Sequence, residues 1–470
     1  MTQSHIDTDY LIIGAGASGM AIADELVTQT DAEIVLIDRR HQPGGHWVDA
    51  YPFVRLHQPS AFYGVNSRPL GFDRIDESGP NAGYYERASG AELVDYYQRV
   101  LDEQLLGSGR VRFLGSSEFL GDRTAATAHD GPYTVRSVLD GHETIISARR
   151  RVVDATYVES IVPMRHRRPY AAAPETRIGT PTDIVRLADS TGRFTVIGAG
   201  KTAMDTCCFL LDQGVDQDSI RWILPRDGWF VDRRGTQPLT LAAGMAEYQA
   251  DLIESIASST TGEEFARNFE ERGWFLRLDP SVEPAVHRGA NVSAREIEQL
   301  RSIENTVRLG RVRSISANAV HLEHGDVIAD RTDVYVDCTA QGLATSPLRP
   351  IFSPGAITVQ FTTLGVAPWS ASVIGYVESL DIDDEDRNQL CQPVPRTGLI
   401  ADQLRVYAAG FAVEEVRRGD ERIGGWAAKA RLNPGRSVFS QMSDPQIAAA
   451  LQRTVGSLDA ANRSLAAHAA

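Results

Sequence analysis

The sequence predicts an α/β protein with two separate parallel sheets, and three observations support this prediction. An apolar run, a glycine turn and an amphipathic run follow one another within Asp9–Asp38. The same order recurs within Arg193–Arg226. The chain has 470 residues, which is enough for two or three domains with cores of their own. Two strand–turn–helix–strand units in one chain therefore favour two α/β domains over an all-helical or all-β protein.

The first unit begins with a strand over Tyr10–Ile13 and ends with a strand over Ile34–Ile37. Between them the turn reads GAGASG and leads into an amphipathic helix, which is the order of a Rossmann-like dinucleotide-binding unit. Each glycine has a physical task. Gly14 permits the tight turn, Gly16 lets the backbone approach a pyrophosphate, and Gly19 lets the helix pack on the strand.

The acid after the second strand indicates which dinucleotide binds. Asp38 lies nineteen residues after Gly19, where an acid accepts hydrogen bonds from a ribose. Asp38 would repel a 2′-phosphate, so we expect FAD or NAD here and not NADP. The candidate ligands in this unit are Gly14, Gly16, Ala17, Ser18, Gly19, Asp38 and Arg39.

The second unit has a strand over Phe194–Ile197 followed by GAGKTAMD, a G-x-G-x-x-A turn. Its next strand ends in Pro225-Arg226 instead of an acid. An arginine there suits the 2′-phosphate of NADP, so NADP is favoured over NAD; the alternative is that Arg226 only solvates a strand end. Lys201 would add positive charge where the anion lies. The candidate ligands are Gly198, Gly200, Lys201, Thr202 and Arg226.

A second short motif repeats together with the two glycine turns. Gly14 and Gly198 are 184 residues apart, and Asp154-Ala155-Thr156 recurs as Asp337-Cys338-Thr339 after 183 residues. The repeat is compatible with two nucleotide-binding domains that close on similar terminal strands, and the equal spacing is also compatible with chance, because the intervening segments do not look alike. We expect the second domain to be inserted in the first. The predicted parts are a first domain over 1–163, a second domain over 164–334 with a helical insertion at about 239–304, and a return to the first domain with a C-terminal helical segment over 335–470.

Capping patterns and periodicity predict further elements. Ser89 and Glu92 form a capping-box pattern at the start of a helix over Ser89–Leu106, and Ser293 and Glu296 form another. Three β runs after the first helix are typical of a meander. They are Val111–Leu114, Tyr133–Val138 and Thr144–Ser147, and helices are expected over Ala242–Ser258 and Gly262–Arg272.

Composition limits the partners. The net charge of −15 leaves no broad basic surface for nucleic acid or anionic lipid. There is no run of eighteen apolar residues and no signal-peptide pattern, so we expect no membrane span and a cytoplasmic location. The four cysteines form no C-x-x-C pair and the histidines are scattered, so we expect neither a redox dithiol nor a metal site.

Four motifs resemble those of the two-dinucleotide-binding flavoproteins, in particular the class B flavin monooxygenases (the flavin-containing and Baeyer–Villiger group). Their order and spacing cover most of residues 9–230. The chain departs from the Baeyer–Villiger pattern in having His57 where those enzymes place an aspartate, which indicates a divergent relative. The motifs are GAGASG at Gly14–Gly19, GGHW with YP at Gly44–Pro52, RLHQPS at Arg55–Ser60 and GAGKTAMD at Gly198–Asp205.

The resemblance implies FAD in the first domain, NADPH in the second, and the flavin ring at their junction. It places Gly45, His46 and Trp47 beside FAD, and Arg55 and His57 beside the flavin as catalytic candidates. Arg55 would supply fixed positive charge. His57 would control protonation, because an ordinary histidine titrates near neutral pH. An equal alternative is that His57 only makes a hydrogen bond to its own loop.

The implied activity is the oxygenation of a small organic substrate by molecular oxygen. NADPH would reduce the flavin, and oxygen would then form a flavin C4a-(hydro)peroxide that transfers one oxygen atom. Two alternatives stay open. One is an NAD(P)H-dependent flavoprotein dehydrogenase or reductase that uses the same sites without oxygen insertion. The other is a flavin-binding sensor without turnover, which the intact second glycine turn argues against.

Overall fold

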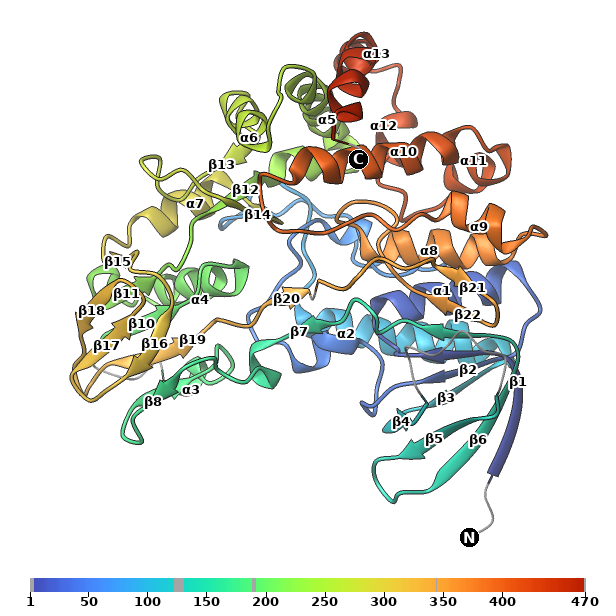
Figure 1. The fold of residues 1–470 in the computed structure, drawn as a ribbon, viewed down its shortest axis with the longest axis horizontal. Coiled ribbons are helices and arrows are strands. Elements are labelled where there is room, and N and C mark those ends of the chain that lie inside the picture. Colours follow the sequence, from blue (N-terminus) through green and yellow to red (C-terminus); the bar gives the residue numbers. More distant parts are fainter. Residues whose placement is uncertain (1–3, 122–130, 188–191, 344, 469–470) are drawn as a thin grey trace.

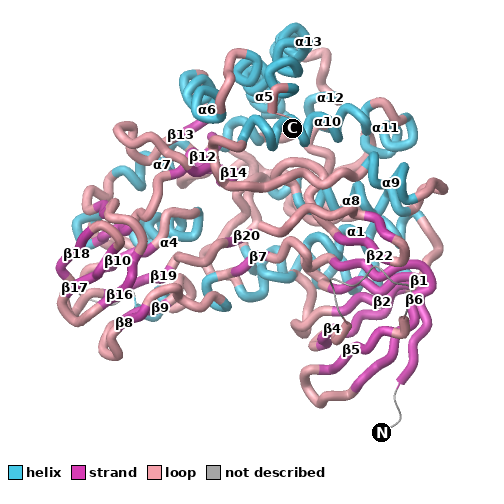
Figure 2. The backbone as a smooth tube through the Cα atoms, in the orientation of Figure 1, coloured by secondary structure: helices cyan, strands magenta, loops and turns pink. Residues whose placement is uncertain are grey.

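The computed structural model describes residues 4–121, 131–187, 192–343 and 345–468. Figure 1 shows two bodies side by side, each built on a sheet, with helices above the junction between them. Figure 2 shows that long loop segments cross between the two bodies. No helix in the described ranges is long and apolar enough to cross a membrane.

The first body contains an eight-stranded sheet in which β1 lies at the centre. The order is β21-β22-β6-β1-β2-β3, and β4 and β5 continue from β6 as an antiparallel pair. The apolar run of β2 is buried throughout, as expected for a parallel strand covered on both faces. The strands are β1 (Ser4–Ile13), β2 (Ile34–Ile37), β3 (Val111–Leu114), β4 (Ser117–Phe119), β5 (Tyr133–Ser137), β6 (Glu143–Asp154), β21 (Phe352–Ser353) and β22 (Ala356–Thr358).

Two of the β predictions for this body are wrong. Residues 143–154 form one long strand, β6, instead of ending after Ser147. β3 pairs with β2 in parallel, so it is not part of the meander, which consists of β4, β5 and β6. A short apolar run does not reveal its partner, because strand pairing is decided by segments distant in sequence.

Helices pack against the first sheet. α1 (Ala17–Gln29) and α8 (Ala367–Glu378) contact each other and share its core. α2 (Gly90–Arg99) begins at the predicted capping box and continues as a π-helical turn over Val100–Leu105.

The second body contains a five-stranded parallel sheet in the order β15-β11-β10-β19-β9. A four-stranded sheet, β18-β17-β16-β8, packs on one face, and α4 (Lys201–Asp212) and α7 (Ala294–Arg301) share the core on the other. The strands are β8 (Ala171–Ala172), β9 (Arg177–Gly179), β10 (Phe194–Ile197), β11 (Ile220–Ile223), β15 (Thr306–Val307), β16 (Val312–Ile315), β17 (Ala319–Leu322), β18 (Gly325–Ile328) and β19 (Val334–Asp337), and a short helix, α3 (Ile184–Leu187), precedes β10.

The region above the junction combines the predicted insertion with C-terminal helices. Trp229, Phe265 and Tyr407 share one core there, and α13 packs on α5. The insertion also contains strands, which the helical prediction missed. The elements are β12 (Gly228–Asp232), β13 (Phe275–Leu276), β14 (Val286–Val292), α5 (Ala242–Ala257), α6 (Gly262–Glu271), α9 (Asp384–Leu390), α10 (Gln403–Arg418), α11 (Glu421–Ala427), α12 (Arg436–Phe439) and α13 (Pro445–Ala466).

The chain leaves the first sheet after β6 and returns to it with β21 and β22. Its two crossings pair as short antiparallel strands, β7 (Ser160–Ile161) and β20 (Gly342–Leu343), between the bodies (Figure 1). The predicted fold class is thereby confirmed: two Rossmann-like sheets, the second inserted in the first. The residue bounds of the three parts stay a prediction.

The repeated D-x-T motif closes the corresponding strand of each sheet in the same way. Asp154 accepts a hydrogen bond from the Thr156 hydroxyl at 2.6 Å, and Asp337 accepts one from Thr339 at 2.7 Å. Both motifs lie beside a glycine turn, so the repeat reflects one local structure used twice.

Candidate functional site

The first glycine turn is tightly packed by its own chain. Gly14 has φ +99°, and a Cβ there would lie 2.7 Å from the Thr156 methyl group. A Cβ on Gly19 would lie 1.8 Å from the Gly14 carbonyl oxygen. Both positions therefore require glycine for the turn and for the packing of α1 on β1.

The loop that follows β2 lies against this turn. The Gly44 N–H donates to the Ala15 carbonyl at 2.9 Å, and Gly45 has φ +58°. A Cβ on Gly45 would lie 2.8 Å from the Gly16 Cα, so the two backbones approach with no side chain between them. Gly16 is the N-cap of α1, and no side chain of the described residues caps this helix. Its first amides and the positive end of its dipole therefore suit an anion.

Asp38 binds the backbone of the first glycine turn. Its side chain is buried, with Oδ2 accepting from the Ala15 N–H at 2.8 Å and Oδ1 from the Arg40 N–H at 2.8 Å. A carboxylate offers about four acceptor positions, so capacity for ribose hydroxyls remains. The ribose contact stays a prediction.

The other candidates in the first body have internal partners. The Trp47 indole N–H donates to the Tyr63 hydroxyl at 2.9 Å. His46 lies beside Trp47, and burial lowers its pKa to about 4. Arg39 pairs with Glu159 at the surface. Ala17 and Ser18 begin α1 directly after the turn.

In the second glycine turn, the chain itself constrains Gly198 but not Gly200. Gly198 has φ +139°, and a Cβ there would lie 2.6 Å from the Cys338 carbonyl oxygen. Trp222 holds the turn by donating its indole N–H to the Gly198 carbonyl at 2.7 Å. Gly200 has ordinary extended backbone, and a Cβ on it would meet no described atom within 4 Å. Packing does not explain that glycine, whereas the close approach of a pyrophosphate would.

Arginines gather beyond the end of β11. Arg226 is exposed and makes no ion pair with any described carboxylate. Burial lowers the pKa of Arg288, and the positive charges of Arg226 and Arg311 lower it further. Such a group suits a 2′-phosphate. Thr202 lies in the first turn of α4.

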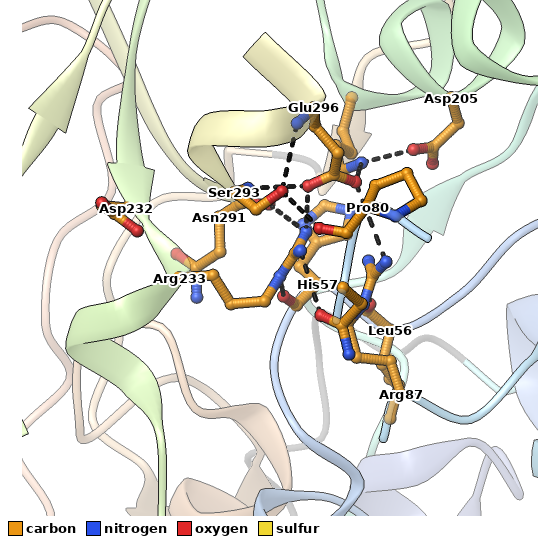
Figure 3. Close-up of polar contacts among 12 residues, drawn as sticks. Leu56, His57, Pro80, Arg87, Asp205, Asp232, Arg233, Asn291, Ser293 and Glu296 are labelled. Atoms are coloured by element: carbon orange, nitrogen blue, oxygen red, sulfur yellow. Dashed lines mark hydrogen bonds and ion pairs between the residues drawn. The ribbon is translucent and has the colours of Figure 1, made fainter. Parts of the chain in front are cut away.

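Lys201 is placed differently from the expectation. Its ammonium group is turned to Asp205 and to Glu296, whose Oε1 lies 3.4 Å away, and it is not an unpaired charge at the turn. With Arg87 and Arg233 these residues form a group at the junction, which we call the junction cluster: Arg87, Lys201, Asp205, Arg233 and Glu296. Figure 3 labels Arg87, Asp205, Arg233 and Glu296.

Glu296 is the centre of the junction cluster. Its Oε2 accepts from Arg233 and from the Ser293 N–H at 2.7 Å, and its Oε1 faces Lys201 and, at 3.8 Å, Arg87. Burial alone would raise the pKa of this carboxyl, but the three cations together hold it well below its usual range. One carboxylate thus joins the first body, the second glycine turn and the insertion.

Arg233 and Arg87 tie the cluster to the loop that carries His57. Arg233 is fully buried, and its Nε donates to the His57 carbonyl at 3.1 Å while Nη1 donates to Asn81 Oδ1 at 3.1 Å. Arg87 Nη1 donates to the Leu56 carbonyl at 3.1 Å (Figure 3). The cluster holds three cations and two carboxylates, so buried positive charge is in excess beside His57.

The two catalytic candidates lie in different surroundings. Burial and the charge of Lys201 lower the pKa of His57 to about 4, so its ring is neutral at pH 7. The premise that His57 titrates near neutrality is therefore wrong. The Arg55 side chain is 56% exposed and donates to the Arg87 carbonyl at 2.9 Å. The buried cations beside His57 are the three of the junction cluster, not Arg55.

The loop before His57 docks on α4. The Tyr51 hydroxyl donates to Asp205 Oδ2 at 2.8 Å. Phe53 stacks on Phe209 with ring centroids 4.2 Å apart and an angle of 13°. The loop that begins on the first glycine turn is thus fixed to the helix that begins at the second.

Sequence reasoning missed Arg87, Arg233 and the site role of Glu296. Glu296 was visible in a capping box, but its other contacts come from segments far away in the sequence. Asp205 was visible at the end of the GAGKTAMD motif. Among the described residues, no group of three histidine, cysteine or acidic side chains could hold a metal ion.

The chain is similar in sequence to a Rossmann-like family and to several bacterial proteins. A family model of an NAD(P)-binding Rossmann-like domain matches residues 12–63. The uncharacterized protein Rv2000 of Mycobacterium tuberculosis is 41% identical over 429 residues, which is 91% of this chain and 78% of that protein. The probable FAD-binding monooxygenase AlmA of Acinetobacter baylyi is 33% identical over 103 residues, 22% of this chain and 18% of that protein.

Two solved structures share the fold. A polycyclic ketone monooxygenase from Thermothelomyces thermophila matches with a TM-score of 0.51 and 12% identity, over 100% of this chain and 89% of that one. An open crystal structure of cyclohexanone monooxygenase matches with a TM-score of 0.50 and 14% identity, over 94% of this chain and 98% of that one. The chain therefore belongs to the family of the mycobacterial protein Rv2000, and its fold is that of the class B flavin monooxygenases.

Proposed function

We propose that this protein is an FAD-dependent, NADPH-using oxidoreductase that oxygenates a small organic substrate with molecular oxygen. The observation that carries the proposal is the arrangement of the two glycine turns. Each follows a central parallel strand, and the loop that packs on the first turn docks on the helix of the second through Tyr51 and Phe53. Two dinucleotides bound at these turns would both lie against the loop that leads to His57.

The residues at both turns fit the two cofactors. FAD would be held by the amides after Gly14 and Gly16, including those of Ala17, Ser18 and Gly19; Asp38 would bind its ribose, and Arg39, Gly45, His46 and Trp47 would complete the site. NADPH would be held by Gly198, Gly200 and Thr202, Arg226 would bind its 2′-phosphate, and Lys201 would add positive charge at the start of α4. The bound flavin supplies hydride acceptance and oxygen activation, and the protein orients it and excludes water.

The chain's own groups at the junction have defined tasks. Neutral His57 offers one hydrogen-bond donor and one acceptor and carries no charge at pH 7. Arg87, Arg233 and Lys201 provide fixed positive charge that stabilises negative charge developing nearby. Arg55 adds to this charge from the exposed side.

The similarity of part of this chain to AlmA, a probable FAD-binding monooxygenase, favours an oxygenase over a dehydrogenase. The cytoplasmic location stays a prediction.

Stopped-flow absorbance tests the reaction class. The FAD-loaded protein is reduced by NADPH without oxygen and then mixed with oxygen. We expect a lasting spectrum distinct from both oxidised and reduced flavin, followed by oxygen transfer to a substrate. Direct reoxidation without a third spectrum would favour a dehydrogenase or reductase, and failure to take up FAD would contradict both.

The Arg226→Ala variant tests the second site. A charge-assisted bond to phosphate contributes about 1.5–3 kcal/mol, so the preference for NADPH over NADH should fall by about 10- to 100-fold in kcat/KM. Arg331→Ala is the matched control, because Arg331 is exposed in the same body and precedes the amino end of β19, whereas Arg226 follows the carboxyl end of β11 in the same parallel sheet. An unchanged preference in Arg226→Ala would contradict the phosphate assignment.

A further inference from the structure

Glu296 connects three parts of the chain that carry different components of the proposed site. Arg233 follows β12 directly, Lys201 begins α4 directly after Gly200, and Arg87 lies in the first body. The side chains of Glu296 and Lys201 are each only 7% exposed. An unpaired buried charge is costly, so if Glu296 loses one of these cations, the remaining cations must move closer to its carboxylate.

Lys201 is the member within reach of the second glycine turn. Its ammonium group has three donors and is shared between Asp205 and Glu296 Oε1, the latter at 3.4 Å, which is longer than a good hydrogen bond. A nucleotide phosphate at the start of α4 would compete with Glu296 for this group.

Arg87 has spare capacity on the other side of Glu296. Its Nη2 lies 3.8 Å from Glu296 Oε1, an ion-pair distance but not a hydrogen bond. Its Nε is buried and has no hydrogen-bond partner in the described part of the chain. Its Nη1 is bound to the carbonyl of Leu56, the residue before His57. A movement of Arg87 toward Glu296 would therefore shift the backbone next to His57.

We infer that Glu296 is a positioning residue that couples occupancy of the second glycine turn to the placement of His57. When a nucleotide phosphate takes Lys201, Oε1 of Glu296 loses that partner, and Arg87 closes on it and draws Leu56 and His57 along. Oε2 stays on Arg233 and the Ser293 amide, so the insertion remains in place. This inference rests on the proposed NADPH site.

The test is a titration of the FAD-loaded full chain with NADP⁺. Calorimetry measures the dissociation constant, and the absorbance change of the flavin is recorded in a parallel titration. In Glu296→Gln, Lys201 is no longer shared with a carboxylate on α7, so NADP⁺ should bind about fivefold more tightly. The flavin absorbance change at saturation should fall to less than half of the wild-type value, because Arg87 no longer moves toward a carboxylate at position 296 and His57 is not shifted. Glu298→Gln is the matched control, an exposed acid on the same helix.

Lys201→Met completes a double-mutant cycle. It should weaken NADP⁺ binding, and adding Glu296→Gln to it should change nothing further. Additive effects of the two substitutions would overturn the inference. If Glu296→Gln does not fold, Glu296→Asp, which keeps the charge and shortens the reach, takes its place; an unchanged dissociation constant and flavin signal in it would also overturn the inference.

The outcomes separate the two proposals. Wild-type protein that takes up FAD but binds no NADP⁺ contradicts the proposed function. Wild-type protein that binds NADP⁺ while Glu296→Gln behaves as Glu298→Gln contradicts only the coupling.

Discussion

Among single residues, the glycines of the second turn show how a structural requirement can be separated from a ligand requirement. Gly198 is constrained by the chain itself, since a Cβ there would strike the Cys338 carbonyl. Gly200 is free of such contacts and has ordinary backbone angles. A substitution at Gly200 therefore reports on what binds, and a substitution at Gly198 reports on folding.

Gly200→Ala should weaken NADP⁺ binding by at least tenfold and lower the free energy of unfolding by less than about 1 kcal/mol, the usual loss at an N-cap. Gly198→Ala should destabilise the protein by more than about 2 kcal/mol through strain and collision. Calorimetric titration and urea denaturation measure the two effects. Wild-type NADP⁺ affinity in Gly200→Ala would show that no phosphate approaches this turn.

The lowered pKa of His57 predicts a pH dependence. A group with a pKa of about 4 is protonated only below about pH 5, so its charge does not change between pH 6 and 8. His57→Gln should therefore change the rate of flavin reduction by the same factor across that range. Rates measured by stopped flow at constant ionic strength check this. A step near pH 6.5 that disappears in His57→Gln would contradict burial of the neutral ring.

At the scale of elements, two helices start with the same capping box in different surroundings. In α2 the box of Ser89 and Glu92 is partly exposed, whereas in α7 the Ser293 hydroxyl also donates to the Pro80 carbonyl at 2.7 Å. The helices resemble each other in sequence pattern, and the Gly90 N–H of α2 donates to the Val54 carbonyl at 3.1 Å. Of the two capping serines, only Ser293 donates its hydroxyl to a segment distant in sequence.

Ser89→Ala should lower the free energy of unfolding by about 1 kcal/mol, the typical value of an N-cap. Ser293→Ala should lower it by about 2 kcal/mol or more, because the Pro80 carbonyl also loses the Ser293 hydroxyl, its partner in a part-buried bond. Urea denaturation of the two variants gives the comparison. Equal losses would mean that the contact with Pro80 contributes nothing.

The same elements show how far the sequence predicts the structure. β2 and β10 have the bounds expected for them, because each apolar run is bounded by turn-forming residues. Both capping boxes form as expected. The length of β6 and the partner of β3 were mispredicted, because pairing depends on distant strands. The junction cluster was not predicted, since residues 87, 201, 233 and 296 meet only through the tertiary fold.

At the scale of the whole molecule, the loop before His57 fastens one body to the other. Phe53 and Phe209 stack across the junction, and Tyr51 binds Asp205. The two nucleotide turns are therefore held in a fixed relation by contacts outside the turns themselves.

A double-mutant cycle of Phe53→Leu and Phe209→Leu should give a coupling of about 0.5–1.5 kcal/mol, the range for aromatic pairs. The same cycle should show slower flavin reduction by NADPH in each single variant, because the bodies are less well aligned. Urea denaturation and stopped flow supply the data. Strictly additive losses of stability would mean that the rings are neighbours without interaction.

The interrupted first sheet also affects how the chain is made. β6 ends at Asp154, and its neighbour β22 comes about 200 residues later. At synthesis rates of about 5–20 residues per second, that interval is about 10–40 s. During it β6 has an open edge, with backbone N–H and C=O groups that a second nascent chain can pair with. A ribosome-bound intermediate ending before β22 is thus the stage at which this protein most needs a chaperone.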